Sequence, residues 1–285
     1  MEEQIKISNG TVSAVISTLG AELKSVVKDG KEILWEGDPA VWKGQAPLLF
    51  PICGQLRDGK YIYEGKEYQM GGHGFAKNSE FMVENADDLS ATFTLCSSEE
   101  TLKTYPFQFE LRVTYTLIEN AIEIKYLVSN KGKKKMHFSI GAHEGYACPE
   151  GVEAYSLVFE HPENLVYNNL KIPLLDYKQF TFGENIQELP LKYEYFAVDT
   201  LSFLELKSRK VSLKNITTGE VKATVDFNSF PYLFVWTEND AKFICIEPWN
   251  GMPDFFDSDY DFANKKGSKT LDVGESFECR HSITL

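Results

Sequence analysis

The sequence is poor in arginine and in positive charge generally. Only four arginines occur in 285 residues, namely Arg57, Arg112, Arg209 and Arg280. With 42 acidic residues against 29 lysines and arginines, the formal net charge is −13. Nucleic-acid binding requires a basic face for phosphate contacts, so this balance argues against it. Because arginine is the usual bidentate clamp for phosphate and carboxylate groups, its scarcity favours a neutral ligand.

Long apolar segments and paired cysteines are also missing. The longest apolar run, residues 46–53, is interrupted by Pro47 and Pro51, so no membrane association is predicted. The polar N-terminal residues 1–4 lack the basic and apolar regions of a signal peptide. The five cysteines (53, 96, 148, 245 and 279) show neither a CxxC pair nor metal-ligand spacing. They predict buried, reduced thiols in the cytoplasm and no metal site.

Sustained helical periodicity is nearly absent. Residues 99–103, after Ser97 or Ser98 as N-cap, predict a single helical turn. Alternation with a period of two dominates instead, and turn signals separate the alternating segments. The clearest segments are 11–16, 91–95, 111–117, 121–127 and 221–227, with a tight hairpin at 61–68. Because no linker divides the chain, we expect one domain over residues 1–285, an all-β chain folded as a large antiparallel β-sandwich.

Two histidines lie in glycine-rich segments. His73 stands between Gly72 and Gly74, in a loop that must bend close to another part of the chain. His143 follows a strand-like run, at a strand end where functional groups concentrate. A lone histidine is often structural, so both readings stay open for each residue. Glu144 adjoins His143, but neighbours on an extended chain point to opposite faces, so we do not expect them to pair.

Glu247 is the sharpest signal. It follows the apolar run 243–246 and precedes Pro248 and Trp249. A buried carboxylate is costly unless it is paired, hydrogen-bonded or functional, and apolar surroundings would raise its pKa toward the range of a general base. The alternative is an exposed carboxylate at a strand end. Trp249 could stack on the apolar face of a sugar or belong to the core.

Weaker candidates lie elsewhere. Asp199 could accept hydrogen bonds from ring hydroxyls, and Asp254 is expected to form a turn. Gln55 and Arg57 would lie on the same side of an extended segment, where either could reach a ligand. If the two histidines and Glu247 meet, they can exchange protons with a small polyol without a cofactor.

These segments together resemble the aldose 1-epimerase (galactose mutarotase) family, in particular its LacX-like branch. The resemblance rests, in chain order, on residues 50–68, 73–81, 141–143, 199–201 and 247–249. It implies a galactose mutarotase-like supersandwich with a site in a groove on one sheet. It also implies interconversion of the α and β anomers of a free aldohexose, with no metal and no cofactor.

The resemblance also implies residue roles. Glu247 would be the general base that takes the proton from the C1 hydroxyl, and His143 the general acid that protonates the ring oxygen. His73 would hold or polarise the ring-oxygen side, and Asp199 would accept hydrogen bonds from sugar hydroxyls. Such an exchange requires no energy source, because the two anomers are nearly equal in free energy, and a pre-organised pocket suffices.

Two positions depart from the family's pattern. Gln55 and Lys77 each stand where related sequences often carry arginine, so the choice of sugar could differ, and Arg57 could compensate. Since a phosphorylated hexose would require a cationic cluster, the sequence predicts a neutral aldose such as galactose or glucose. This small sugar is the only partner predicted, and the chain is expected to be a monomer or a homodimer.

Two other functions remain open at this stage. The first is a carbohydrate-binding protein that has lost catalysis. The second is a hydrolase or lyase on a related sandwich, in which Glu247 would pair with Asp199 or Asp254 across a scissile bond.

Overall fold

The computed structural model describes residues 3–285, so the first two residues of the polar N-terminal stretch lie outside the described part. Strands follow the alternation in the sequence: in β9 (Phe109–Ile118) buried residues alternate with partly exposed ones. Within residues 3–285, α-helix is limited to α1 (Glu99–Thr104), which Ser98 caps through a capping box. No helix of this part of the chain is long and apolar enough to cross a membrane. The all-β prediction is confirmed.

The strands form two main sheets, and every pair of named strands is antiparallel. The small sheet has the order β1–β2–β3–β4, and the large sheet follows the path β12–β20–β19–β16–β14–β17–β18–β22–β10–β9–β8–β7, with β13 added on β20 and β15 on β14. The small sheet comprises β1 (Gln4–Ser8), β2 (Val12–Ser17), β3 (Leu23–Lys28) and β4 (Lys31–Glu32). The other strands of the large sheet are β7 (Met82–Ala86), β8 (Ser90–Cys96), β10 (Ala121–Asn130), β12 (Ile140–Gly141), β13 (Glu144–Ala147), β14 (Tyr155–Lys171), β15 (Leu174–Pro190), β16 (Leu201–Phe203), β17 (Lys210–Asn215), β18 (Val221–Asp226), β19 (Tyr232–Trp236), β20 (Phe243–Asn250) and β22 (Ser276–Thr284).

Short elements complete the fold. The predicted hairpin is present as β5 (Lys60–Tyr63) and β6 (Lys66–Gln69), and Tyr61 stacks on Tyr68 across it with ring centroids 5.2 Å apart. A second ladder joins β11 (Met136–Phe138) to β21 (Lys269–Leu271). Single 3₁₀ turns are η1 (Arg57–Gly59), η2 (Ala76–Asn78), η3 (Val152–Ala154) and η4 (Tyr193–Phe196).

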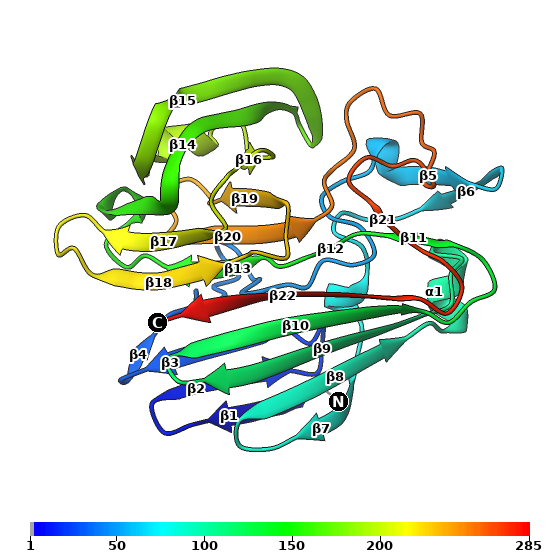
Figure 1. Ribbon diagram of the computed structural model, residues 1–285, viewed down its shortest axis with the longest axis horizontal. Coiled ribbons are helices and arrows are strands. Elements are labelled where there is room, and N and C mark those ends of the chain that lie inside the picture. The colour runs from blue at the N-terminus through cyan, green and yellow to red at the C-terminus, as the bar shows by residue number, and fades with distance from the viewer. Residues whose placement is uncertain (1–2) are drawn as a thin grey trace.

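The two main sheets share one apolar core. Figure 1 shows β7–β10 and β22 in the lower half of the molecule, together with the small sheet, and β14–β20 in the upper half. Ile16 of β2, Phe93 of β8 and Val113 of β9 belong to the same buried cluster, and Tyr115 of β9 donates a hydrogen bond to the carbonyl of Ala21 at 2.6 Å. This continuous core supports the single-domain prediction, which remains our proposal.

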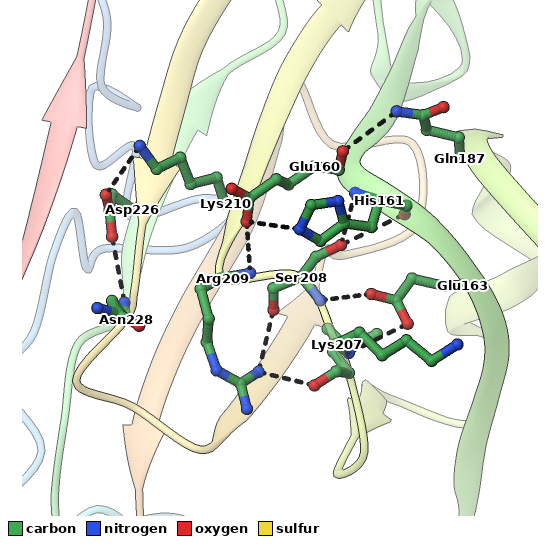
Figure 2. Close-up of polar contacts among 11 residues, drawn as sticks. Glu160, His161, Glu163, Gln187, Lys207, Ser208, Arg209, Lys210, Asp226 and Asn228 are labelled. Atoms are coloured by element: carbon green, nitrogen blue, oxygen red, sulfur yellow. Dashed lines mark hydrogen bonds and ion pairs between the residues drawn. The ribbon is translucent and has the colours of Figure 1, made fainter.

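The long β14–β15 hairpin, called the arm below, belongs to the large sheet and lies above β19 and β20 in the view of Figure 1. Polar contacts hold it halfway along β14, where the carboxylate of Glu163, 1% exposed, accepts hydrogen bonds from the backbone N–H groups of Ser208 at 2.5 Å and Lys207 at 3.1 Å (Figure 2). Near the tip, the N–H of Leu175 donates to the carbonyl of Asp254 at 2.9 Å. Because the arm is held at both places, residues near its tip are positioned at the site described next.

Candidate active site

Strand β20 places Glu247 in the middle of the large sheet. All eight residues of β20 are buried between β19 on one side and β12 and β13 on the other. The two short strands pair with β20 in one register, with Gly141 opposite Trp249 and Glu144 opposite Ile246. His143, between them, therefore lies opposite Glu247. Nε2 of His143 is 3.3 Å from Oε2 of Glu247.

Burial determines the protonation of this pair. The side chains of His143 and Glu247 are 10% and 2% exposed. Desolvation raises the pKa of Glu247 well above its usual range, and the nearby carboxylates of Asp199 and Glu144 raise it further. Desolvation lowers the pKa of His143 to about 3, with the charge of Lys77 acting in the same direction. Burial therefore favours the uncharged form of both partners, a neutral imidazole and a protonated carboxyl.

His73 approaches the pair from a loop. Its Nδ1 accepts a hydrogen bond from the N–H of Gly54 at 3.2 Å, which leaves the ring proton on Nε2. Its ring centroid is 5.4 Å from that of His143, and burial lowers the pKa of His73 well below its usual value. Gly74 has φ +71°, and a Cβ there would lie 2.2 Å from the carbonyl oxygen of Phe50. Only glycine lets this loop pack so closely while presenting His73.

A cavity of about 260 Å³ opens over the pair. This is below the range of about 300–1,000 Å³ typical of sites for drug-sized ligands and suits a single sugar ring. The tip of the arm closes one side with Leu170 and Pro173. The lining includes polar side chains, Gln55, His73, Lys77, His143, Asp199, Thr200 and Glu247, and three indole rings, Trp42, Trp236 and Trp249. Six of the seven residues proposed from the sequence therefore face one cavity.

Arg57, the seventh, does not line it. The turn η1 begins at Arg57, directly after the extended Leu56. The Arg57 guanidinium donates to the carbonyl of Ser258 at 2.7 Å and lies over the ring of Tyr260. These contacts direct its side chain toward residues 258–260.

Asp254 is likewise engaged elsewhere. Its carboxylate forms a buried ion pair with Lys265 at 2.7 Å and accepts the N–H of Arg57 at 3.0 Å. Glu144, predicted not to pair with His143, is bonded on the opposite side to His281 of β22 at 3.1 Å. That prediction is confirmed.

Sequence reasoning missed two of the indole rings. Trp249 is 3% exposed, and Phe234 covers one of its faces at a centroid distance of 3.9 Å. Trp42 and Trp236 are only half-buried, and Trp42 stacks on His143 at 5.3 Å. Their rings are more accessible to a sugar than that of Trp249. Trp42 lies in an irregular segment, where neither periodicity nor a motif marks it.

A buried His–Glu pair at the floor of a small cavity in a β-sandwich is an arrangement suited to acid–base chemistry on a small ligand. The comparison with known families identifies the family to which such a protein belongs. A family model described as aldose 1-epimerase matches residues 3–284, and the chain belongs to that family. It is an isomerase that acts as a sugar epimerase.

Individual relatives agree with this assignment. The plasmid-borne protein LacX of Lactococcus lactis subsp. lactis is 40% identical over 263 residues, covering 87% of this chain and 88% of LacX. A galactose mutarotase related enzyme from Lactobacillus acidophilus superimposes with a TM-score of 0.94 at 35% identity, covering 99% of this chain and 97% of the other. A galactose mutarotase-like protein from Lactobacillus casei ATCC 334 gives 0.92 at 30% identity, covering 99% of both chains. The predicted family and sandwich fold are confirmed.

The loop that carries His73 yields a test of its packing. We expect Gly74→Ala to lower the free energy of unfolding by more than about 1 kcal/mol, because the new methyl group would meet the Phe50 carbonyl at a positive φ. Gly71→Ala is the matched control, since a Cβ there meets nothing within 4 Å. Urea unfolding measures both, and equal stability of the two variants would contradict the packing described.

Proposed function

We propose that the chain interconverts the α and β anomers of a free aldohexose, such as galactose or glucose, by general acid–base ring opening and closure. The observation that carries this proposal is the 3.3 Å contact between His143 and Glu247 at the floor of the cavity. Ring opening removes a proton from one sugar oxygen and delivers one to another, and this pair offers an acceptor and a donor within one pocket.

The number of protons on the pair stays constant through the reaction. Glu247, as carboxylate, takes the proton of the C1 hydroxyl. His143, as imidazolium, gives its proton to the ring oxygen, and the bond between C1 and the ring oxygen breaks. The open-chain sugar then faces a neutral pair, which is the form that burial favours. Rotation about C1–C2 and the reverse transfers close the ring as the other anomer. The pair carries one proton throughout.

Substrate binding has to supply the reactive charge state. The free site favours neutral His143 and protonated Glu247, whereas ring opening begins from the ion pair. Sugar hydroxyls that donate to the Glu247 carboxylate would favour its charged form. The Nε2–H of His73 would contact the ring-oxygen side, and Asp199 would accept from hydroxyls further along the ring.

The remaining alternatives differ in testable ways. With Asp254 bound to Lys265 outside the cavity, a hydrolase would have to use Asp199 as its second carboxylate. Release of reducing ends from an oligosaccharide would support that reading. A binding protein without catalysis would bind sugars and leave anomer exchange unchanged. The cytoplasmic location expected from the unpaired cysteines stays a prediction.

Loss of either partner should abolish the acceleration. We expect Glu247→Gln and His143→Gln each to lower kcat by about 10²–10⁴-fold, the usual contribution of a general acid or base. NMR exchange spectroscopy on α- and β-galactose measures this directly. His137→Gln is the matched control, because His137 is also a buried histidine but bonds Thr270 away from the cavity. Wild-type rates in either catalytic variant would refute the assignment.

The pH profile should reflect the shifted pKa values. Because the pKa of His143 is lowered to about 3, a second proton does not enter the pair until the solution is strongly acidic. We therefore expect kcat/KM to stay nearly constant from about pH 7 down to about pH 5, after subtraction of the uncatalysed rate. On the alkaline side, activity should persist until Glu247, whose pKa is raised, loses its proton. An acid limb near the usual histidine pKa of about 6.5 would contradict this.

Charge in the cavity bears on the choice of sugar. Among the described lining residues, Lys77 is the one lysine or arginine; burial and the charge of Lys43 lower its pKa, and it already donates to the carbonyl of Gly72 at 2.9 Å. A single desolvated amine is a weak phosphate site compared with an arginine cluster. We expect faster anomer exchange of galactose or glucose than of glucose 6-phosphate. Equal turnover of the free and phosphorylated sugars would contradict the neutral-substrate proposal.

A further inference from the structure

We propose that His143, Cys245 and Glu247 form a binding site for a thiophilic divalent cation, represented by Zn²⁺, and that its occupation blocks the cavity. This inference goes beyond the proposed epimerase activity and concerns a residue, Cys245, that the acid–base mechanism does not use. Zinc would then inhibit the enzyme, because it would bind the same imidazole and carboxylate that transfer protons in the proposed reaction.

The three donor atoms already lie close together. One imidazole nitrogen, the Cys245 sulfur and one Glu247 oxygen all lie within 4.8 Å of one another. Cys245 and Glu247 are two residues apart on β20, so they share a face of the strand, and His143 lies opposite Glu247 in the link between β12 and β13. The distance of 3.3 Å between His143 Nε2 and Glu247 Oε2 is close to the edge of about 3.4 Å that a tetrahedral zinc site with ligands at about 2.1 Å would have. Cys245 needs an inward movement of only about 1 Å to join them.

The donor set also suits the ion. Nitrogen, sulfur and oxygen from His, Cys and Glu are the ligands that zinc accepts, and three protein ligands leave the fourth position open to the cavity. Oε2 of Glu247 is buried and forms no hydrogen bond in the described structure, although Nε2 of His143 lies 3.3 Å away, and the buried Nδ1 of His143 has no hydrogen-bond partner. Such unpartnered buried atoms are uncommon, and an ion bound between the side chains would satisfy the carboxylate oxygen.

Apolar packing keeps the three donor groups close together. Cys245 packs among Trp35, Trp42, Phe243 and Trp236, which keep its side chain beside the pair. Because Zn²⁺ binds a thiolate and a carboxylate, its binding releases to solvent the protons that Cys245 and Glu247 carry, while a neutral His143 binds without losing one. The ion would occupy the position of the reacting sugar oxygens and act as a competitor.

No metal-ligand spacing is visible along the sequence, and the reason is structural. Cys245 and Glu247 are two residues apart, but the third ligand, His143, lies about a hundred positions earlier, between β12 and β13. The expectation that the cysteines have no metal role was based on chain spacing alone. The register of β12 and β13 on β20 brings His143 close to Cys245 and Glu247.

The test uses metal binding and inhibition together in the full chain. Cd²⁺, a spectroscopic substitute for Zn²⁺, should produce an ultraviolet thiolate-to-metal absorption band that saturating galactose reduces. Zn²⁺ should inhibit anomer exchange in competition with sugar, and EDTA should reverse the inhibition. Cys245→Ala should lose the band and should weaken zinc inhibition by about tenfold or more, since it removes a ligand of the inner sphere. Cys96→Ser is the control, because Cys96 is the exposed cysteine and should not alter either signal.

Each outcome is decisive. An unchanged band and unchanged inhibition in Cys245→Ala, or loss of the band in Cys96→Ser, would overturn the site, as would absence of both signals in the wild type. Circular dichroism checks that the variants are folded. If Cys245→Ala does not fold, galactose competition decides. A Cd²⁺ band that galactose displaces equally in the wild type and in Cys96→Ser supports the site, and a band that galactose does not displace overturns it. Since the band does not depend on turnover, failure of the metal site and failure of the epimerase proposal are distinguished.

Discussion

Removal of water from one histidine–carboxylate pair is the constraint on which the rest of the site depends. In water, Glu247 would be charged and His143 would titrate near neutrality. Within the sheet, burial opposes charge on both groups and therefore favours the neutral pair. In our proposal, the charged pair therefore forms across the 3.3 Å contact only when a bound sugar stabilises it with hydrogen bonds.

The fold maintains this desolvation from several directions. β20 lies inside the large sheet, so its backbone groups are paired on both edges and its register fixes His143 opposite Glu247. Trp42 covers the imidazole, and the β14–β15 arm closes the cavity from above. Behind the strand, the buried Glu144–His281 contact joins β13 to β22 and adds a carboxylate that raises the pKa of Glu247 further. The same enclosure holds Cys245 beside the pair, which is why the proposed cation site and the proposed proton chemistry share two residues.

Local pattern was enough to predict the fold class and much of the site. The strands from 111–117 and 121–127 alternate strictly because one face meets the core, and Ser98 caps α1 through its side chain, so both could be predicted from neighbouring residues. Glu247 was recognisable because a carboxylate in an apolar strand is costly. Arg57 is absent from the cavity lining because its guanidinium contacts Ser258 and Tyr260, and no local pattern encodes a contact between segments so far apart in the chain. Trp42, Trp236 and the Cys245 contact depend on which strands pair, and no local pattern encodes that pairing.

The most direct test of this account is the charge state of His143, measured by ¹⁵N NMR of the imidazole at neutral pH, with His143→Gln to assign the signal. The account predicts a neutral ring in the free protein. It also predicts that addition of galactose shifts the ring signal toward that of imidazolium. An imidazolium already present in the free protein, with an ordinary or raised pKa, would contradict the claim that burial keeps the pair neutral until a sugar binds.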